Sequence, residues 1–219
     1  MAATDAERAQ RDAGVTKSVV DAFHTLFYYS PGAWSATWLG VPILQNPMDM
    51  WALQEVIVES KPELIIETGT AYGGSALFYA SVFGGEVVSV DLQEQFKPRY
   101  TQPRITFLKG NSVDPNVVTR VSELARGKRT MVVLDGDHSA ATVLKELEAY
   151  APLVSDRCYL VVCDTNIGGQ PVLPDVQDGG PKVAVQQYLP AHPEFVVDRS
   201  CEKFLMTFFP GGWLRRVAS

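Results

Sequence analysis

The chain alternates short apolar, β-branched runs with segments whose apolar residues recur at helical spacing. The apolar runs predict strands at 63–68, 86–91, 105–108, 131–135 and 158–164. The helical spacing predicts helices at 47–60, 73–82, 115–125, 139–151 and 181–189. Helices that alternate with strands bring the strands together in a mostly parallel sheet, so the pattern indicates an α/β fold.

The two ends of the chain depart from this alternation. Residues 1–15 are polar and alanine-rich, which is typical of a frayed helix or a disordered lead, and 19–29 carries a helical apolar stripe. An irregular aromatic segment follows at 34–46. At the C-terminus we expect two strands joined by a charged hairpin, at 195–198 and 204–209.

Composition narrows the class of protein. The 219 residues are 46% hydrophobic and 20% charged, which is enough for one α/β domain with a sizeable core. The net charge of −6 argues against a basic surface that binds nucleic acid. No long apolar run predicts a membrane span, and the first residues lack an apolar signal region. The chain has an odd number of cysteines, Cys158, Cys163 and Cys201, and they lack the spacing of metal ligands. We expect them to be reduced. We therefore expect a soluble, cytoplasmic protein without membrane or nucleic-acid partners.

A glycine turn follows the first expected strand and leads into a helix. Gly69 and Gly74 fit the outer positions of a dinucleotide-binding fingerprint, but Ala71 fills the middle one, where the backbone must approach a pyrophosphate. Glu67 stands at the strand tip, where a carboxylate repels a diphosphate and suits a ligand with an ammonium and a sulfonium group. S-adenosylmethionine (SAM) is such a ligand, so we expect the turn to bind SAM. An ordinary strand–turn–helix corner is the alternative.

The ends of the next strands supply further candidate SAM contacts. Asp91 ends the second strand about 20 residues after the glycine turn, where a carboxylate can accept hydrogen bonds from both ribose hydroxyls or else cap a turn. After the third strand, Asn111 or Ser112 is placed to border the adenine. The residues expected to bind SAM are Glu67, Gly69, Thr70, Tyr72, Gly73, Ser75, Asp91, Asn111, Ser112 and Asp135.

Acidic residues and a histidine gather where the fourth and fifth strands end. Asp135, Asp137 and His138 follow the fourth strand, and Asp164 ends the fifth. Parallel strands end at one sheet edge, so we expect these side chains to meet there, and carboxylate oxygens suit Mg²⁺. The metal would lower the pKa of a substrate hydroxyl, and His138 would take its proton as general base before the alkoxide attacks the sulfonium methyl group. The alternative makes these acids helix caps, with Ser139 capping the next helix.

The alternation and its final hairpin fit a Rossmann-like class I methyltransferase sheet of seven strands, the last one antiparallel. We interpret 1–62 as a helical and irregular N-terminal extension that packs on a SAM-binding core at 63–219. The aromatic part of this extension and the Gly/Pro/Asp-rich loop 165–180, a candidate substrate lid, are expected to shape the acceptor pocket. The sequence leaves the acceptor and the oligomeric state open, a homo-oligomer included.

Six motifs follow one another along the chain: WLGVP at 38–42, QNPMD at 45–49, ETGTAYGGS at 67–75, DGDH at 135–138, DTN at 164–166 and PGGWL at 210–214. Together they resemble the cephalosporin hydroxylase family, whose relatives include the rhamnosyl and macrolide-sugar O-methyltransferases. The resemblance runs from about Trp38 to the C-terminus. Despite its historical name, this family is similar throughout to SAM- and Mg²⁺-dependent methyltransferases.

The resemblance implies roles for the matching residues. Asp135 would bind the metal, His138 would be the general base, and Asp164 would be a second metal ligand. The family usually has a Glu–Asp pair at the end of the fifth strand, whereas this chain has Cys163 before the acid, and a thiol is a poor ligand for Mg²⁺. The difference implies weaker metal binding, a ligand role for Asp137, or a member that works without metal.

We therefore expect a SAM-dependent O-methyltransferase that uses Mg²⁺ and methylates a hydroxyl of a small molecule, such as a sugar of a natural product or glycolipid. A catechol-type O-methyltransferase would share the metal chemistry but accept a planar diol. The alternative from another class is a SAM-binding accessory subunit, inactive alone, that supports a partner hydroxylase or methyltransferase; Cys163 is the reason to keep it.

Overall fold

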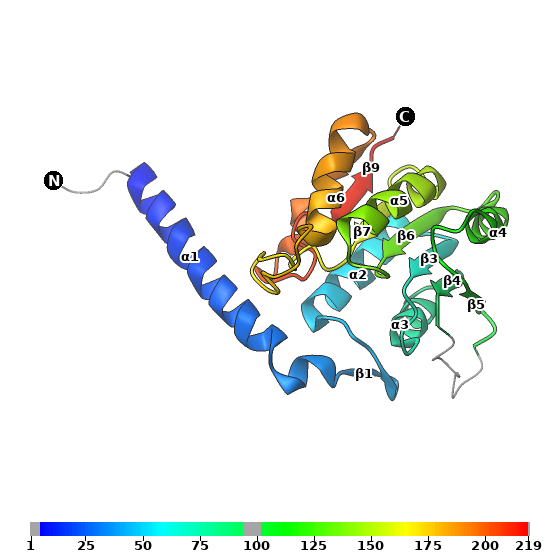
Figure 1. Cartoon of the computed structure of the whole chain (residues 1–219), viewed down its shortest axis with the longest axis horizontal. Coiled ribbons are helices and arrows are strands. Elements are labelled where there is room, and N and C mark those ends of the chain that lie inside the picture. The colour runs from blue at the N-terminus through cyan, green and yellow to red at the C-terminus, as the bar shows by residue number, and fades with distance from the viewer. Residues whose placement is uncertain (1–4, 94–101, 219) are drawn as a thin grey trace.

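A seven-stranded sheet forms the centre of the protein (Figure 1). The computed structural model describes residues 5–93 and 102–218, with side chains described from residue 14 onward. The sheet strands are β3 (Leu64–Thr68), β4 (Glu86–Asp91), β5 (Ile105–Lys109), β6 (Thr130–Leu134), β7 (Tyr159–Val162), β8 (Phe195–Val197) and β9 (Trp213–Arg216). Their order is β5-β4-β3-β6-β7-β9-β8, and only β9 runs antiparallel to its neighbours β7 and β8. The expected seven-stranded α/β sheet with an antiparallel last strand is confirmed.

The sequence of the central strands explains their position. Every residue of β3, β6 and β7 is buried, which matches their unbroken apolar, β-branched runs. Strands covered on both faces read as continuous apolar runs because both sides of the pleat pack against helices. Strand β5 lies at one edge and is only partly buried. The strands that carry the candidate site residues are therefore the best-packed ones.

Helices cover both faces of the sheet. On one face, α2 (Pro47–Ser60) and α3 (Gly74–Val82) pack through residues such as Leu53 and Phe78. On the other face lie α4 (Pro115–Ala125), α5 (Ala140–Tyr150) and α6 (Gly180–Tyr188). Both α2 and α5 have side-chain N-caps: the Asn46 side chain accepts from Met48 N, and Ser139 Oγ accepts from Thr142 N. These caps fix where α2 and α5 begin, next to the carboxyl edge of the sheet.

The expected strand at 204–209 is wrong. The chain crosses this stretch without regular structure, after the short 3₁₀ helix η4 (Arg199–Glu202), and the strand that pairs with β8 is β9. Phe208 N donates to Asp49 Oδ2 at 2.7 Å, and Phe208 O accepts from Asn166 N at 3.2 Å. These backbone groups bond to α2 and to the loop after β7, so Met206, Phe208 and Phe209 are buried without joining the sheet, whereas Phe204 and Leu205 are exposed.

The N-terminal part begins with a long helix, α1 (Asp5–Tyr28), that extends away from the rest of the protein (Figure 1). It is followed by the 3₁₀ helix η1 (Pro31–Trp34) and by a small ribbon of β1 (Thr37–Trp38) and β2 (Val41–Pro42).

Two further 3₁₀ helices complete the described elements, η2 (Ala151–Leu153) and η3 (Leu189–Ala191). The helical or disordered lead expected at 1–15 is helical from residue 5, and residues 1–4 lie outside the described ranges. Most of the polar loop expected after β4 lies outside them too. Within those ranges, no helix has the length and apolar character needed to cross a membrane.

Candidate active site

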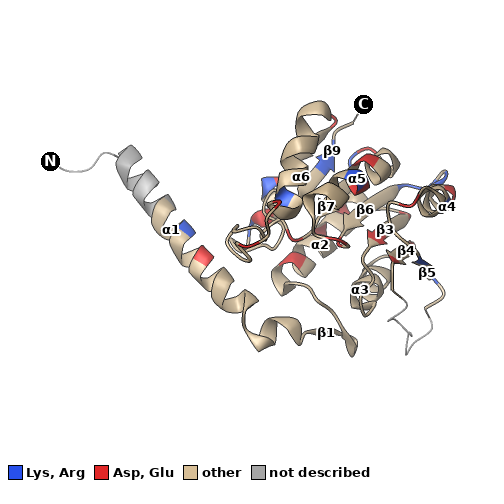
Figure 2. Ribbon diagram, viewed as in Figure 1, with Lys and Arg blue, Asp and Glu red and all other residues tan. Residues whose placement is uncertain are grey.

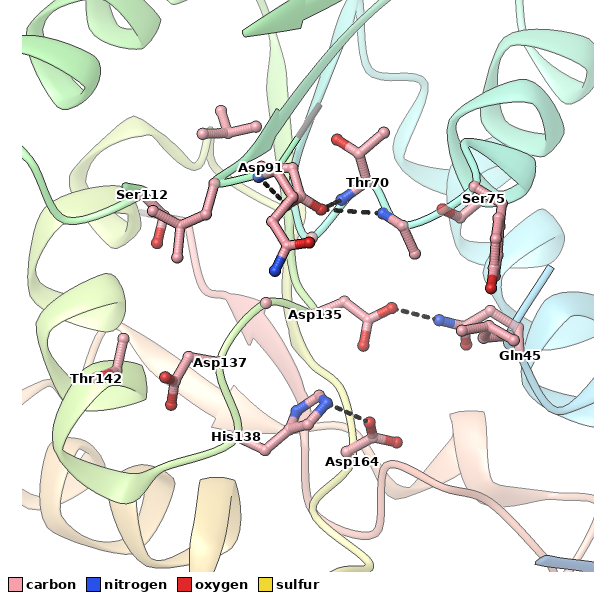
Figure 3. A pocket seen from close by; sticks show the side chains of 18 of the residues that line it. Gln45, Thr70, Ser75, Asp91, Ser112, Asp135, Asp137, His138, Thr142 and Asp164 are labelled. Atoms are coloured by element: carbon pink, nitrogen blue, oxygen red, sulfur yellow. Dashed lines mark hydrogen bonds and ion pairs between the residues drawn. The ribbon is translucent and has the colours of Figure 1, made fainter. Parts of the chain in front are cut away.

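A cavity of about 680 Å³ opens at the carboxyl edge of β3, β4, β6 and β7 (Figure 3). The strand order reverses here, because β3 leads to β4 on one side while β6 lies on its other side. Open α/β sheets bind their ligands at such a reversal, in the crevice outside the carboxyl ends of the strands. Among the described residues, four carboxylates line the cavity: Asp91, Asp135, Asp137 and Asp164.

The glycine turn forms one wall of the cavity. Gly69 has φ of +88°, and a Cβ on it would lie 1.9 Å from the carbonyl oxygen of Asp135. Glycine is therefore required where the turn packs on the end of β6. Ala71 also lies in the left-handed region, with φ of 43°. Asp91 Oδ2 holds the turn in place by accepting from Thr70 N at 2.9 Å and Ala71 N at 3.0 Å (Figure 3).

Asp91 thus caps the turn and also lines the cavity. Its Oδ1 accepts from Gln93 N at 2.9 Å. A carboxylate has about four acceptor positions, so three backbone donors leave room for one further hydroxyl. The capping role that the sequence left as an alternative is present, and it is compatible with binding a ribose.

Glu67 lies deeper than expected. Its side chain is fully buried beneath the turn, it is not among the residues that line the cavity, and its Oε2 accepts from the Ser89 hydroxyl at 2.5 Å. Burial raises the pKa of Glu67 to about 7, against the opposing effect of hydrogen bonds from Ser75 and Ser89. The geometry makes Glu67 a support below the turn.

Most of the other residues expected to bind SAM line the cavity. They are Gly69, Thr70, Tyr72, Ser75, Asp91, Asn111, Ser112 and Asp135. Gly73, with φ of 79°, caps α3 and lies behind that lining. Asn111 and Ser112 follow β5 as expected; Asn111 Oδ1 accepts from Val113 N, and the Tyr150 hydroxyl donates to Ser112 O at 2.7 Å. These bonds hold the loop opposite the glycine turn.

Asp135, His138 and Asp164 form a group whose potential ligand atoms all lie within 4.8 Å of one another. His138 Nε2 lies 3.2 Å from Asp164 Oδ2 (Figure 3). Asp164 has φ of 54°, a left-handed conformation that non-glycine residues adopt at functional sites more than elsewhere. Asp137 lies outside the group and is exposed, and its Oδ1 accepts from Ser139 N at 2.7 Å. Asp137 therefore binds the backbone of Ser139, and Ser139 is the residue that caps α5.

In the part of the chain that the structure describes, no Lys or Arg forms an ion pair with Asp135 or Asp164. The pKa of Asp135 is raised well above its ordinary value by burial, and then by the charges of Asp164 and Glu67. Burial also raises the pKa of Asp164, whereas His138 acts in the opposite direction. Hard oxygen donors that repel one another at a partly buried position fit a divalent cation such as Mg²⁺, which would remove the repulsion.

Cys163 takes no part in this group. Its side chain is buried in the core on the α2 side of the sheet, and burial raises the pKa of its thiol well above the ordinary value, with the charges of Asp135 and Asp164 adding to the effect. Tyr159, Val161 and Cys163 pack in the same core cluster, because every second residue along β7 points to the same face and Cys163 directly follows the strand. The position that carries an acid in the resembling family is thus a core position in this chain.

Sequence reasoning missed several residues of the site, and Gln45 is the most important of them. Gln45 Nε2 donates to Asp135 Oδ2 at 2.6 Å, so the N-terminal extension holds the carboxylate that ends β6 (Figure 3). Nothing in the local pattern around Gln45 signals this contact, which joins residues 90 positions apart. The aromatic segment and the loop at 165–180 both line the cavity, as expected. The aromatic segment contributes Trp34, and the loop contributes Ile167 and Leu173.

Glu146 on α5 predicts a measurable pH dependence of stability. Burial raises its pKa to about 7, and neither of its carboxyl oxygens has a hydrogen-bond partner among the described residues. A carboxyl group with a raised folded-state pKa stabilises the fold below its unfolded pKa, and that stability is lost as pH rises through the folded value. Glu146→Gln cannot ionise, so at about pH 8 it should exceed the wild type by on the order of 2 kcal/mol, or roughly 4–8 °C in Tm, and match it at about pH 5.

Thermal unfolding of both proteins across this pH range, without SAM, measures the difference. The exposed Glu123 provides a control, since Glu123→Gln should follow the wild type at each pH. A constant offset between Glu146→Gln and the wild type at all pH values would contradict the assignment.

The fold and the cavity together define a class of protein. Class I methyltransferases have a parallel sheet with an antiparallel last strand. They also have a glycine turn after the first strand of the core and an acid at the end of the second, and this chain has all three features. Residues 32–217 match the family Rhamnosyl O-methyltransferase/CmcI, and the chain belongs to this family. The resemblance drawn from the sequence motifs is confirmed, and the chain is an O-methyltransferase.

Relatives of known name cover nearly the whole chain. It is 37% identical over 214 residues to a rhamnosyl O-methyltransferase of Mycobacterium leprae (strain TN), covering 92% of each chain. It is 35% identical over 212 residues to one of Mycobacterium bovis (strain BCG / Pasteur 1173P2), covering 91% of this chain and 85% of the relative.

Solved structures agree with the fold. The structure is similar to the CmcI-N160 apo-structure, with a TM-score of 0.66 and 19% identity, and to a CmcI-D160 structure described as Mg-SAM, with 0.65 and 20%. Both comparisons cover 87% of this chain and 79% of the other. At this identity the likeness is one of fold.

Proposed function

We propose that this chain is a SAM- and Mg²⁺-dependent O-methyltransferase whose acceptor is a sugar hydroxyl, in the first place that of a rhamnosyl unit. The observation that carries the proposal is that Asp135, His138 and Asp164 lie together in the same cavity as the glycine turn. Two relatives of at least 35% identity are named for rhamnosyl O-methylation, which supports the choice of acceptor. We place the SAM-binding core at 63–219 and treat 1–62 as an extension that completes the site.

The glycine turn and the loops opposite it would bind SAM. Thr70, Tyr72 and Ser75 line the cavity on the turn, and Asp91 is positioned for a ribose hydroxyl. Asn111 and Ser112 would border the adenine from the far side. Gly69 keeps the turn close to the end of β6, and Glu67 and Gly73 support it from behind.

Asp135 and Asp164 would hold Mg²⁺, and Gln45 would orient Asp135 through its amide group. When bound, the metal supplies positive charge that lowers the pKa of the acceptor hydroxyl. His138 would accept the hydroxyl proton at Nε2, the ring nitrogen that faces Asp164. Asp137 belongs to the cap of α5, so we do not propose it as a ligand, although the sequence allowed it. Because Cys163 points into the core, it leaves this set of donors unchanged.

The acceptor would bind against an apolar wall. Tyr28, Trp34, Ile167 and Leu173 line the cavity, the first two from the N-terminal part and the others from the loop after β7. Tyr29 Oη accepts from Leu173 N at 3.2 Å, which joins the two segments. The C–H faces of a deoxy sugar would pack on such a wall. A catechol is the competing acceptor in the test below. The accessory-subunit role that the sequence left open is set aside, because the chain belongs to a family of O-methyltransferases and His138 lies beside Asp164.

We also propose a cytoplasmic location. All three cysteines, Cys158, Cys163 and Cys201, are free and buried. Disulfides are rare in the cytoplasm because thiols are kept reduced there.

The function is tested by ligand binding and then by methyl transfer. Saturating SAM should raise the Tm of the wild type, since a ligand that binds only the folded state stabilises it. Transfer of a labelled methyl group from SAM to a rhamnosyl glycoside should then require Mg²⁺ and stop on addition of EDTA. A glucosyl glycoside and a catechol are the competing acceptors. The absence of any SAM-induced shift would refute the central proposal, and preferred methylation of the catechol would refute the acceptor.

Asp91→Ala is expected to weaken SAM binding by about tenfold or more while the protein stays folded. The alanine removes the acceptor for the ribose and for the amides of Thr70 and Ala71, so the turn loses its support as well. Titration calorimetry with SAM measures the affinity. Asp114→Ala is the matched control, because Asp114 caps α4 outside the cavity lining. Equal SAM affinity in Asp91→Ala and the wild type would remove Asp91 from the SAM site.

A further inference from the structure

Helix α1 has apolar side chains on two opposite faces, and its inner face is anchored to the body. The His24 ring stacks on Phe208 with centroids 5.1 Å apart, and Phe27 packs against the same ring at 6.1 Å. His24 Nε2 also lies 2.8 Å from Asn166 Nδ2, in the loop that follows Asp164. The inner face of α1 therefore packs against other residues of the same chain.

The outer face of α1 is uncovered. It carries Val15, Val19, Ala22 and Leu26, spaced four, three and four residues apart, and Tyr29 follows just after the helix. This is the spacing of a coiled-coil seam. Val19 is 63% exposed and Leu26 is 71% exposed. A helix that is apolar on both sides is normally covered on both sides.

Most of α1 lies away from the body. Figure 1 shows α1 extending from the rest of the protein, with only its C-terminal end close to other elements. In the part of α1 whose side chains are described, the charged residues are Lys17 and Asp21, and Figure 2 shows the rest of that part without charge. Both lie on the inner half of the helix by the 100° per residue of an α-helix, since they are two and six residues from Val15. The outer half is thus free of charge within that part.

We propose that the stripe Val15, Val19, Ala22, Leu26 and Tyr29 binds the same stripe of a second copy of this chain, with the two helices antiparallel. Ala22 lies at the middle of the stripe, with Val15 seven residues before it and Tyr29 seven after it. An antiparallel pair centred there places Val19 of one copy near Leu26 of the other and Val15 near Tyr29. The small side chain of Ala22 lets the helices approach closely where they cross. A two-fold pair uses the same patch on both copies, which a stripe symmetric about its centre satisfies.

Area and charge favour a second copy over a lipid surface. The exposed apolar side chains of α1 carry on the order of 500 Å² per copy, so a pair buries about 1,000 Å², the size at which specific interfaces begin. Helices that bind a lipid surface carry a polar face rich in Lys and Arg. The α1 sequence instead contains Asp5, Glu7, Asp12 and Asp21 against Arg8, Arg11 and Lys17, and the whole chain has a net charge of −6.

Light scattering on the intact protein, without SAM, tests the pairing independently of methyl transfer. The wild type should have at least twice the mass of the 24.0 kDa chain, and Val19→Asp/Leu26→Asp should halve the mass of the wild-type assembly. Lys17→Glu is the matched control: it changes charge on the opposite side of the same helix and should keep the wild-type mass. Circular dichroism shows whether each variant stays folded.

A cysteine variant provides a second test that does not depend on destabilising the pair. Ala22→Cys should give a disulfide-linked dimer on mild oxidation, while the buried native cysteines give none in the wild type. Val15→Cys, away from the centre, should stay unlinked in an antiparallel pair. A wild type with the mass of one chain would overturn the proposal, whether or not it sediments with phosphatidylcholine–phosphatidylglycerol vesicles. So would an unchanged mass in Val19→Asp/Leu26→Asp, and efficient linkage through Val15→Cys would overturn the antiparallel order.

Discussion

His138→Ala is expected to lower kcat by about a hundredfold or more while SAM affinity stays close to that of the wild type. The imidazole lies beside Asp164, exposed to the cavity, where it can take the proton of a bound hydroxyl. Alanine removes this proton acceptor, but the glycine turn and Asp91, which line the other side of the cavity, are left unchanged. Single-turnover kinetics measure the chemical step, and titration calorimetry measures SAM binding.

Two controls separate a base from a structural histidine. His192→Ala should keep full activity, because His192 stacks on Tyr188 and does not line the cavity. The pH profile provides the second control: the acidic limb of kcat that reports protonation of a base should be present in the wild type and absent in His138→Ala. Unchanged turnover in His138→Ala, or loss of SAM binding together with turnover, would contradict the role.

Asp164→Asn is expected to weaken Mg²⁺ binding by about a hundredfold and to lower methyl transfer in proportion at limiting metal. The amide removes one negative charge from the group of Asp135, His138 and Asp164, and it is a weaker donor for a hard cation. High Mg²⁺ should restore part of the activity, because the amide oxygen can still coordinate. Calorimetric titration of Mg²⁺ into the SAM-loaded protein gives the affinity.

Asp137→Asn is the matched control for this prediction. Asp137 carries the same charge in the same cavity but lies outside the group of three. Its replacement should leave Mg²⁺ affinity within about twofold, apart from a small loss of helix capping. If Asp137→Asn lost the metal and Asp164→Asn kept it, the metal position would have to move toward α5.

The sheet and the location of the site follow from local patterns in the sequence. The β-branched run that ends at Thr68 is long enough and apolar enough to be buried on both faces, whichever helices cover it. Gly69 then allows a tight turn in which a Cβ atom would clash with the backbone of Asp135. Acidic residues follow at the ends of β4, β6 and β7. Because parallel strands all end at one edge, the order of these residues along the chain was enough to predict that they share one cavity.

Contacts between distant segments decided what the sequence left open. The run at 204–209 is apolar and aromatic like a strand, but its backbone bonds to Asp49 and Asn166, so packing overrides its local preference. Glu67 and Asp91 both stand near strand ends, yet only Asp91 lines the cavity, because Glu67 pairs with Ser89 inside the sheet whereas Asp91 lies two residues further along its strand, at the edge.

The sequence by itself determined the α/β sheet, the SAM-type turn and the gathering of Asp135, His138 and Asp164, because spacing along strands and turns dictates each of them. Only the tertiary structure decided that Gln45 reaches Asp135 and that Cys163 belongs to the core. It alone also showed that α1 uses its inner face and leaves its outer face uncovered. Those outcomes depend on which surfaces meet when the chain closes on itself, and the local pattern of apolar and polar residues carries no information about that.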